Sequence, residues 1–312
     1  MRILLVTQYF WPEEFRVNDL AAGLLEKGHE VTVLTGVPNY PVGSFFRGYG
    51  LRGPRRESFH GARVFRVPIV PRGKSKITLL ANYMSFVLSA SLLGPALCRG
   101  DFEIIVVNQL SPITMAIPAI LLKRVKRAPL VLWVQDLWPE SLSAAGGIRW
   151  QPLLKGIERL VSFIYKHCDL IMAQSEAFFP SILALYDDSR KLRYLPNWAE
   201  STYGLLRKTD TPNSLPEGFI VMFAGNVGVA QDFGTIIAAA DKLRDRQDIN
   251  WVIVGDGRDL NWVRHQVEDR GLNKTVHLLG RKPVEEMPRL LVGADALLVT
   301  LKRARGLSMT VP

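Results

Sequence analysis

The sequence predicts an α/β protein of two domains, each with a mainly parallel sheet covered by helices. The first observation behind this prediction is that short apolar runs alternate with amphipathic stretches from the first residues onward, as in consecutive βαβ units. The second is that the alternation restarts after residue 216. The third is that residues 199–216, between the two series, are rich in Ser, Thr, Pro and Asn, as linkers are. We therefore expect domains at 1–198 and 217–312, joined by 199–216.

The first domain opens with a strand at 2–7, followed by an amphipathic helix at 17–27 and a strand at 30–35. Gly28 and Gly36 are placed to end the helix and the second strand. Further apolar runs predict strands at 62–67, 103–108, 130–134, 170–173 and 192–195. Helical or loop stretches separate most of them, which favours a parallel sheet with helices on its faces.

The second domain repeats this alternation after a glycine turn that follows its first strand. Its predicted strands lie at 220–223, 251–254, 276–278 and 296–300. Its predicted helices lie at 233–246, 260–270 and 284–291. This order is again that of an α/β unit with a parallel sheet.

Composition excludes several classes of protein. The chain has 312 residues, of which 48% are hydrophobic and 22% charged, so it is too apolar to be disordered. Its two cysteines, Cys98 and Cys168, form no disulfide framework and no Cys/His cluster with metal-ligand spacing. This favours the cytosol and argues against a structural zinc site.

The net charge of +10 is concentrated in residues 47–76, where Glu57 is the single acid among many Lys and Arg residues. Such a run can bind nucleic acid, anionic lipid headgroups or a phosphorylated substrate. We expect no nucleic-acid partner, because few aromatic residues interleave and no nucleic-acid-binding motif occurs. The residues that we assign to the membrane or to an acceptor phosphate are Arg52, Arg55, Arg56, Arg72, Lys74 and Lys76.

Residues 77–98 contain no charged residue, and their length nearly suits a membrane span. A weakly polar stripe recurs along them at helical spacing: Thr78, Asn82, Ser85 and Ser89. Because such a stripe is costly in lipid, we favour a helix that dips into the membrane surface. A second apolar stretch at 113–122 also ends in basic residues. A core helix and a transmembrane helix are the alternatives.

Ligands of α/β sheets bind at the carboxyl ends of the strands, so we expect the functional residues in the loops there. No GxGxxG, GxxxxGK[ST] or Asp-x-Asp motif occurs, which disfavours a dehydrogenase, a P-loop enzyme and a metal-chelating sugar-nucleotide site. In the loop at 135–141, Asp136, Trp138 and Glu140 suit sugar recognition through hydroxyl hydrogen bonds and ring stacking. Helix capping is the alternative role for Asp136.

Three loops of the second domain suit a nucleotide diphosphate, because glycines let a phosphate approach backbone N–H groups at a helix N-terminus. They are 225–228, with Gln231 shortly after, then 255–258 and 280–283. The candidate donor-binding residues are Gly225, Asn226, Gly228, Gln231, Asp256, Gly257, Arg281 and Lys282.

Six segments together resemble retaining glycosyltransferase family four, and within it the capsule, colanic acid and O-antigen enzymes similar to N-acetyl-L-fucosamine transferases. These segments lie at 28–35, 136–141, 196–197, 224–228, 254–257 and 279–283. The resemblance implies a GT-B fold, with two Rossmann-like domains facing across a cleft. It also implies a UDP- or GDP-sugar donor in the second domain, an acceptor on the first, and neither a metal nor another cofactor.

Carried over to this chain, the resemblance places 225–228 at the donor diphosphate and 280–283 at the nucleobase. It places Asp136, as the catalytic residue, near the transferred sugar, and it adds Asn197 to the sugar or acceptor residues. In the family's retaining mechanism the leaving diphosphate helps to deprotonate the acceptor, so no protein nucleophile is needed.

The chain departs from the family pattern at three positions. Asn226 and Gln231 stand where many members have Arg and Lys, and Gln135 stands where His is frequent. Other cations must then face the diphosphate, and the candidates are Lys282, Lys302 and Arg303. The family continues beyond the Val-Pro at 311–312, so we expect the second domain to be incomplete.

These observations favour a glycosyltransferase that adds a sugar to a lipid-diphosphate-linked saccharide during surface polysaccharide synthesis. We expect it in the cytoplasm, peripheral at the inner face of the bacterial cell membrane. The alternative is a truncated, inactive fragment that keeps membrane binding and lacks a donor site.

Overall fold

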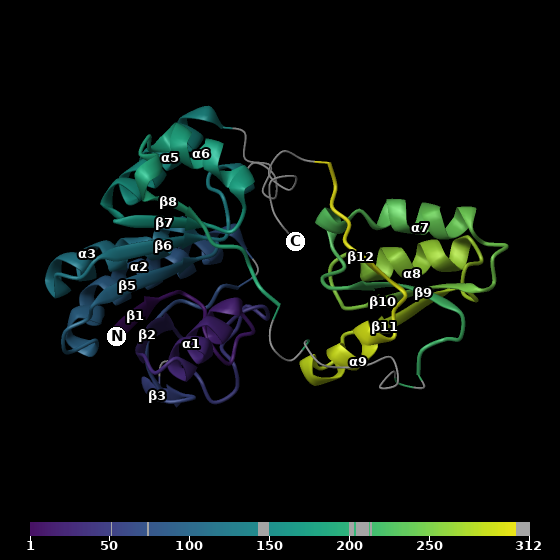
Figure 1. Ribbon diagram of the computed structural model, residues 1–312, viewed down its shortest axis with the longest axis horizontal. Coiled ribbons are helices and arrows are strands. Elements are labelled where there is room, and N and C mark those ends of the chain that lie inside the picture. Colours follow the sequence, from purple (N-terminus) through teal and green to yellow (C-terminus); the bar gives the residue numbers. More distant parts are fainter. Residues whose placement is uncertain are drawn as a thin grey trace. The chain divides into compact units, whose positions relative to one another are not determined.

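The computed structural model describes residues 1–50, 52–73, 75–142, 150–199, 203, 212 and 214–303. The chain divides into two compact units, the first extending from Met1 to Asn197 and the second beginning at Trp198 (Figure 1). Each unit is an α/β structure with its own sheet and its own cores.

The N-terminal unit contains an eight-stranded sheet in the order β3-β4-β2-β1-β5-β6-β7-β8. All neighbouring strands are parallel except β3 and β4. The strands are β1 (Arg2–Val6), β2 (Glu30–Gly36), β3 (Arg56–Phe59), β4 (Ala62–Val67), β5 (Ile104–Gln109), β6 (Leu130–Val134), β7 (Leu170–Ala173) and β8 (Leu192–Tyr194). Every strand expected in this unit is present within one or two residues of its predicted bounds.

The edge strand β3 was not predicted, because its sequence, Arg-Glu-Ser-Phe, lacks an apolar run. It forms a hairpin with β4 through His60 and Gly61, which both have positive φ angles, 48° and 99°. Two such residues are what a two-residue hairpin turn requires.

Helices cover both faces of this sheet. They are α1 (Arg16–Glu26), α2 (Lys76–Leu97), α3 (Ile117–Lys126), α5 (Gln151–His167) and α6 (Phe179–Leu185), with short 3-10 turns at Ile113–Ala116, Glu176–Phe178 and Ser189–Lys191. Gly28, at φ 79°, follows α1 as expected.

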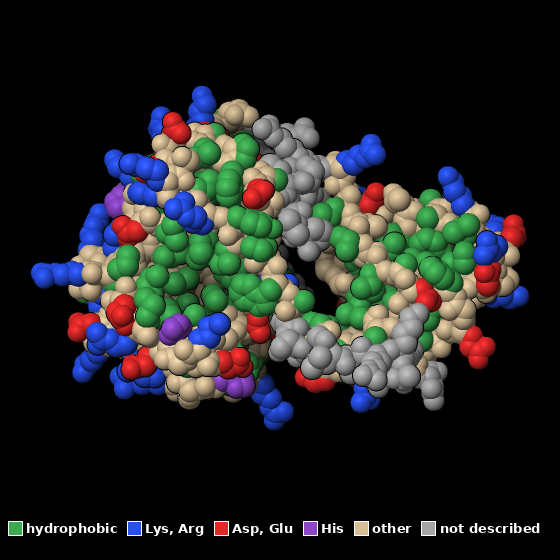
Figure 2. Space-filling view, in the orientation of Figure 1, with side chains coloured by type: hydrophobic (Ala, Val, Ile, Leu, Met, Phe, Trp, Pro, Cys, Tyr) green, Lys and Arg blue, Asp and Glu red, His purple; other side chains and the backbone are tan. Residues whose placement is uncertain are grey.

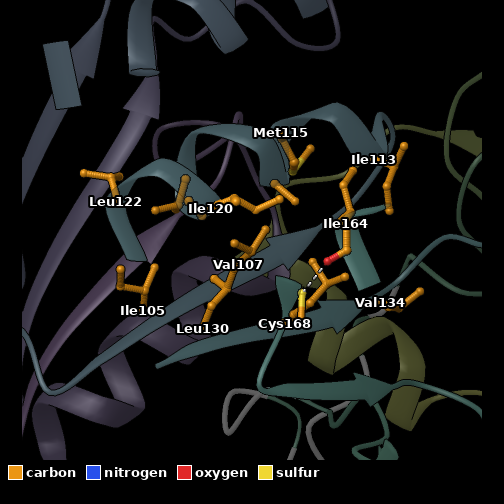
Figure 3. Packing of buried hydrophobic residues seen from close by; sticks show 14 of the residues in the cluster. Ile105, Val107, Ile113, Met115, Ile120, Leu122, Leu130, Val134, Ile164 and Cys168 are labelled. Atoms are coloured by element: carbon orange, nitrogen blue, oxygen red, sulfur yellow. Dashed lines mark hydrogen bonds between the residues drawn. The ribbon is translucent and has the colours of Figure 1, made fainter. Parts of the chain in front are cut away.

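Alternate residues of β1 supply the two cores of this unit. Ile3 and Leu5 pack with α1 on one face, whereas Leu4 and Val6 belong to the larger core beneath the other helices. Figure 3 shows part of the larger core, where Cys168 donates an S–H hydrogen bond of 3.2 Å to the carbonyl oxygen of Ile164. Both cysteines are buried and free.

The C-terminal unit contains a parallel four-stranded sheet in the order β11-β10-β9-β12. The strands are β9 (Phe219–Ala224), β10 (Ile249–Val254), β11 (Val276–Gly280) and β12 (Ala296–Leu298). The helices are α7 (Phe233–Lys242), α8 (Leu260–Asp269) and α9 (Met287–Val292), with 3-10 turns at Val229–Gln231 and Val284–Glu286. The predicted elements are all present, although α7 ends four residues early.

Candidate functional site

In the N-terminal unit, the strand order reverses at β1, which lies between β2 and β5. Open α/β sheets bind ligands where the order reverses, at the carboxyl ends of the strands. The loops there lie at 7–15, 37–43, 110–112 and 135–141, following β1, β2, β5 and β6. We call these four loops the strand-end site of the N-terminal unit.

Asp136 lies in the loop after β6, which is one of the four loops of the strand-end site. Gln109, at the end of β5, donates a hydrogen bond of 3.0 Å from Nε2 to the backbone oxygen of Asp136, which ties the loop after β6 to the loop after β5. Burial raises the pKa of the Asp136 carboxyl, whereas Ser141, Trp138 and Ser111 act in the opposite direction. A carboxyl group held in this way can accept hydrogen bonds from a sugar hydroxyl.

Asn197 is brought to the same edge of the sheet through Gln174. The Asn197 amide donates to Oε1 of Gln174 at 2.7 Å, and the Gln174 amide donates to the backbone oxygen of Gln135 at 2.7 Å. The ends of β6, β7 and β8 are therefore joined by one network of side-chain amides. This network places Asn197 beside the loop that carries Asp136 and Glu140.

Trp138 does not fit the predicted role of stacking on a sugar. Its side chain belongs to the larger hydrophobic core, the residue is 7% exposed, and its indole N–H donates to Oγ of Ser111 at 3.2 Å. The ring faces are covered by protein, so Trp138 instead stabilises the loop. The large aromatic side chains that are exposed at this site are Trp11 and Tyr40, which the sequence argument did not select.

Several buried polar atoms near these strand ends have no hydrogen-bond partner within the described protein. The unpartnered atoms include Oε1 of Gln8, both amide atoms of Asn108, Oε1 of Gln109, Nε2 of Gln135, Oε2 of Glu140, the Tyr165 hydroxyl and Oδ1 of Asn197. Buried polar groups are nearly always satisfied by protein, water or a ligand, because leaving one unpaired is costly. This clustering marks the edge as a polar site suited to hydroxyl-rich molecules.

Among the basic residues expected to bind membrane or phosphate, Arg72 lies in the loop after β4 and contacts residues of the strand-end site. Its guanidinium donates to the Tyr9 hydroxyl at 3.1 Å and lies over the Tyr40 ring at 5.2 Å. Its backbone N–H donates to Oδ1 of Asn39 at 2.9 Å, which fixes the loop before α2. A half-buried guanidinium oriented in this way can bind a phosphate group.

The other basic residues of 47–76 are divided between different positions. Arg66 is buried in the fold, where it pairs with Glu57 and donates to the Trp11 carbonyl oxygen at 2.5 Å, so it adds no charge to the surface. Arg56 is on the edge strand β3, over the Phe65 ring at 5.8 Å. Arg52 and Lys76 are exposed and Arg55 is half-buried, whereas Lys74 lies outside the described residues.

Glu13 is a buried carboxylate of the strand-end site that the sequence argument missed. It is 2% exposed and accepts backbone N–H groups of Asn39 and Tyr40, both at 2.7 Å, and of Phe10 at 3.1 Å. Burial raises its pKa to about 7, although these hydrogen bonds and Arg66 act to lower it. Glu13 therefore holds the loops after β1 and β2 together. A lone acid in a loop gives no signal of such a role in the sequence.

In the C-terminal unit, the loops after β9 and β10 pack backbone against backbone. The Val227 N–H donates to the Asp256 carbonyl oxygen at 2.9 Å. A Cβ atom at Gly255 would lie 1.8 Å from the Gly225 oxygen, and one at Gly257 would lie 2.3 Å from the Val227 oxygen. These positions therefore need glycine, and the loops present a surface of backbone and small polar side chains.

The loop after β12 also reaches this region. The Lys302 N–H donates to the Ala230 carbonyl oxygen at 2.8 Å, and the Thr300 hydroxyl donates to the Gln231 carbonyl oxygen at 2.6 Å. The sheet order reverses between β9 and β12, so Lys302 enters the part of the unit where a ligand is expected. This supports Lys302 as one of the cations that replace those missing at Asn226 and Gln231.

The remaining predicted donor residues lie on the neighbouring strand ends. Asp256 is exposed and accepts the Gly257 N–H at 2.7 Å. The loop after β11 places Arg281 in an exposed and Lys282 in a half-buried position, and the Gly255 N–H donates to the Gly280 oxygen at 2.9 Å. Among the described residues, no group of three or more His, Cys, Asp or Glu side chains could hold a metal ion.

Comparison with known proteins identifies both units. The glycosyl transferase 4-like domain family matches residues 14–198, and the family of glycosyl transferases group 1 matches residues 208–311. WcaI of Escherichia coli (strain K12), named as a colanic acid biosynthesis glycosyl transferase, is 25% identical over 97% of this chain and 77% of its own length. WbjE of Pseudomonas aeruginosa, named as a glycosyltransferase, is 27% identical over 79% of this chain and 60% of its own length.

A solved structure shares the fold. The crystal structure of Anabaena Alr3699/HepE in complex with UDP matches with a TM-score of 0.60 and 16% identity, and covers 96% of this chain and 74% of that chain. Because the first family match spans more than half of the chain and the structural neighbours are GT-B enzymes, the chain belongs to the glycosyl transferase 4-like family of GT-B glycosyltransferases.

Proposed function

We propose that this protein transfers a sugar from a UDP- or GDP-sugar to a lipid-linked saccharide during the synthesis of a bacterial surface polysaccharide. Membership of the glycosyltransferase family supports the transfer chemistry. The similarity to WcaI, named for colanic acid biosynthesis, supports the class of product. UDP in the related HepE structure supports a nucleotide-sugar donor.

The observation that carries the donor side of the proposal is the backbone packing of the loops after β9 and β10. Glycine at 255 and 257 lets the two loops meet backbone to backbone, which brings their small polar side chains together at the strand ends where a ligand of an α/β sheet binds. Lys302 stands beside the first loop through its backbone hydrogen bond to Ala230. Lys282 and Arg303 are the other cations that we assign to the donor phosphates.

The acceptor side rests on the strand-end site of the N-terminal unit. Asp136, Glu140 and Asn197 supply the carboxyl and amide groups that hydrogen-bond sugar hydroxyls. Arg72 supplies a guanidinium for a phosphate of the acceptor. Both kinds of group are required for a saccharide attached through phosphate to a lipid.

We assign a retaining mechanism. The acceptor hydroxyl attacks the anomeric carbon on the face from which the nucleoside diphosphate departs, and the departing phosphate oxygen takes the hydroxyl proton. The bond from the anomeric carbon to the phosphate oxygen breaks, and a bond to the acceptor oxygen forms. Asp136 then acts by positioning the acceptor hydroxyl, and Lys302 by stabilising the charge that develops on the diphosphate.

Nucleotide binding tests the donor half of this proposal directly. A ligand at about 100 times its Kd adds about 2.7 kcal/mol to the stability of the state that binds it. We expect UDP or GDP to raise the melting temperature of the full chain, whereas adenosine and cytidine diphosphates at the same concentration leave it unchanged. If neither UDP nor GDP changes the melting temperature, the proposed donor is wrong.

A further inference from the structure

Helix α2 exposes a continuous apolar stripe. It is 22 residues long, so it extends about 33 Å, and no charged residue follows Lys76 within it. The exposed large apolar side chains recur three or four residues apart and lie along one face: Ile77, Leu80, Met84, Leu88 and Leu92. Ile77 is 82% exposed and Leu92 is 76% exposed, values far from those of core residues.

The polar side of the same helix faces the protein. Asn82 is completely buried, where it accepts a hydrogen bond from Gln8 at 2.7 Å and donates to the Val70 carbonyl oxygen at 2.6 Å. Ser85 accepts the Val70 N–H at 2.9 Å. α2 therefore buries the polar Asn82 while it exposes large apolar side chains, which is unusual for a helix at a protein–water interface.

Packing against the sheet excludes a membrane-spanning orientation of α2 in this fold. Phe86, Val87, Ala90 and Gly94 are buried, and a Cβ atom at Gly94 would lie 2.9 Å from the Leu34 side chain. α2 is the one described helix with the length and hydropathy to cross a membrane, but one side of it is fixed to the unit. Only its outer face is available to a membrane, so it must lie along the surface.

Basic side chains bracket this apolar face. α3 packs against α2, exposes Leu121 and Val125, and ends in Lys123, Arg124 and Lys126, with Arg127 following. In Figure 2, blue side chains gather along the left edge of the N-terminal unit, where Figure 1 places α3. Lys76 begins α2, and the exposed Arg99 lies two residues after its last residue, Leu97.

Two of the acidic side chains of the neighbouring segments, Asp169 and Glu103, have partners within the protein. Asp169 pairs with Lys123 at 2.7 Å, which leaves the other cations of α3 to act outward. Glu103 accepts the backbone N–H of Arg2 at 2.7 Å, whereas the Asp101 side chain is 88% exposed and lies 4.0 Å from the Arg2 guanidinium, so it offsets one of the surrounding cations. The apolar face is thus bordered by net positive charge, which complements anionic lipid headgroups.

We propose that the outer face of α2, with the end of α3, docks the protein flat on an anionic membrane. This deepens the proposed function and rests on it for the origin of the acceptor, since a lipid-linked saccharide is presented at a membrane. The docking face is adjacent to the proposed acceptor site, because Arg72 lies only four residues before α2. Its guanidinium contacts the Tyr9 hydroxyl and the Tyr40 ring. A phosphate at the headgroup level then reaches Arg72 while the lipid tail stays along α2.

Vesicle sedimentation of the full chain tests the docking face. The probes are vesicles of phosphatidylcholine alone and of phosphatidylcholine with about 30% phosphatidylglycerol. We expect the wild type to sediment with the anionic vesicles and much less with the neutral ones. The variant L80Q/L88Q, which replaces two exposed leucines by good helix formers, is expected to lose on the order of 100-fold in partitioning, about tenfold per leucine.

The matched control is Trp262→Gln, which removes an exposed apolar side chain from α8 of the C-terminal unit. It is expected to sediment as the wild type does. The proposal is overturned if the wild type does not bind anionic vesicles, or if L80Q/L88Q binds them as well as the wild type does. It is also overturned if the wild type is a dimer that L80Q/L88Q dissociates without a change in vesicle binding, because the face would then bind a second copy.

The nucleotide-induced change in melting temperature separates this proposal from the proposed function. The substituted leucines lie in the N-terminal unit, so L80Q/L88Q is expected to respond to UDP or GDP as the wild type does. A variant that responds to nucleotide and no longer binds vesicles supports membrane docking. If nucleotide changes the melting temperature of no form of the protein, the proposed nucleotide-sugar donor is wrong. The sedimentation result still tests whether α2 and α3 bind the membrane.

Discussion

The substitution Glu13→Gln is expected to change how the stability of the N-terminal unit depends on pH. The Glu13 carboxyl is 2% exposed, and burial raises its pKa from 4.5 to about 7. The folded state therefore holds the Glu13 proton over a pH range in which the unfolded state has released it. Stability from this group is present at low pH and is lost as the pH rises from about 4.5 through about 7.

The size of the effect follows from the two pKa values. The difference between 4.5 and about 7 corresponds to roughly 3 kcal/mol of unfolding free energy, of which roughly 2.5 kcal/mol is lost between pH 5 and pH 8.5. Gln resembles the protonated carboxyl in shape and does not titrate. Its amide oxygen can still accept the N–H groups of Asn39 and Tyr40, but its NH₂ group meets the Phe10 N–H, which costs about 1 kcal/mol at every pH.

Urea unfolding of the wild type and of Glu13→Gln, measured in parallel from pH 5 to pH 8.5, provides the assay. Other titrating groups, including Asp136 and all those of the C-terminal unit, are common to both proteins, so the difference between the two unfolding free energies isolates Glu13. We expect Glu13→Gln to gain roughly 2.5 kcal/mol relative to the wild type across this range. A difference that is the same at pH 5 and at pH 8.5 would show that the Glu13 carboxyl has the same pKa in the folded and unfolded states.

Three further substitutions test other parts of the structure. Gly255→Ala places a Cβ atom 1.8 Å from a carbonyl oxygen of the loop after β9, so it is expected to abolish the response of the melting temperature to UDP or GDP, whereas Gly234→Ala, with no atom nearer than 3.8 Å, keeps it. Arg66→Met breaks a buried ion pair and is expected to lower the unfolding free energy by about 3 kcal/mol in urea, whereas the exposed Arg56→Met changes it by less than about 1 kcal/mol. Asp136→Asn is expected to lower the rate of sugar transfer on the order of 100-fold with nucleotide binding unchanged, and an undiminished rate would remove this residue from the site.

The strands could be predicted because their signal is local. Each strand that was found is a short apolar run between turn residues, and burial on both faces of a sheet requires that pattern. β3 was missed because an edge strand is partly solvated and tolerates charge, so its Arg-Glu-Ser-Phe sequence resembles a loop. The hairpin turn at His60 and Gly61 was the available signal.

The orientation of α2 could not be read from the sequence. Its polar stripe was recognised, but a stripe shows only that a helix has two sides and not which side faces the protein. Asn82 settles the question, because its partners Gln8 and Val70 lie far from it in the sequence or in a preceding loop. Long-range contacts of this kind leave no trace in the local pattern of hydropathy.

The sequence predicted the strand ends as the place of a candidate site, but it predicted only some of the residues that the structure brings together there. The topology brings Asp136 and Asn197 to one edge, in agreement with the strand-end argument. Trp138 was assigned a ligand contact from residue type alone, whereas packing places it in the core. Glu13 was not predicted as a site residue, because its role depends on burial and on hydrogen bonds from backbone N–H groups of the loop after β2. Only folding brings these groups together.

A transfer assay on anionic vesicles that contain lipid-linked saccharide, with UDP- and GDP-sugars supplied one at a time, tests the proposed activity. We expect one of these donors to yield an elongated lipid-linked saccharide whose new glycosidic bond keeps the anomeric configuration of the donor. A product with inverted configuration would contradict the mechanism. The absence of any product, from a protein that binds the nucleotide and the vesicles, would contradict the assignment of a lipid-linked acceptor.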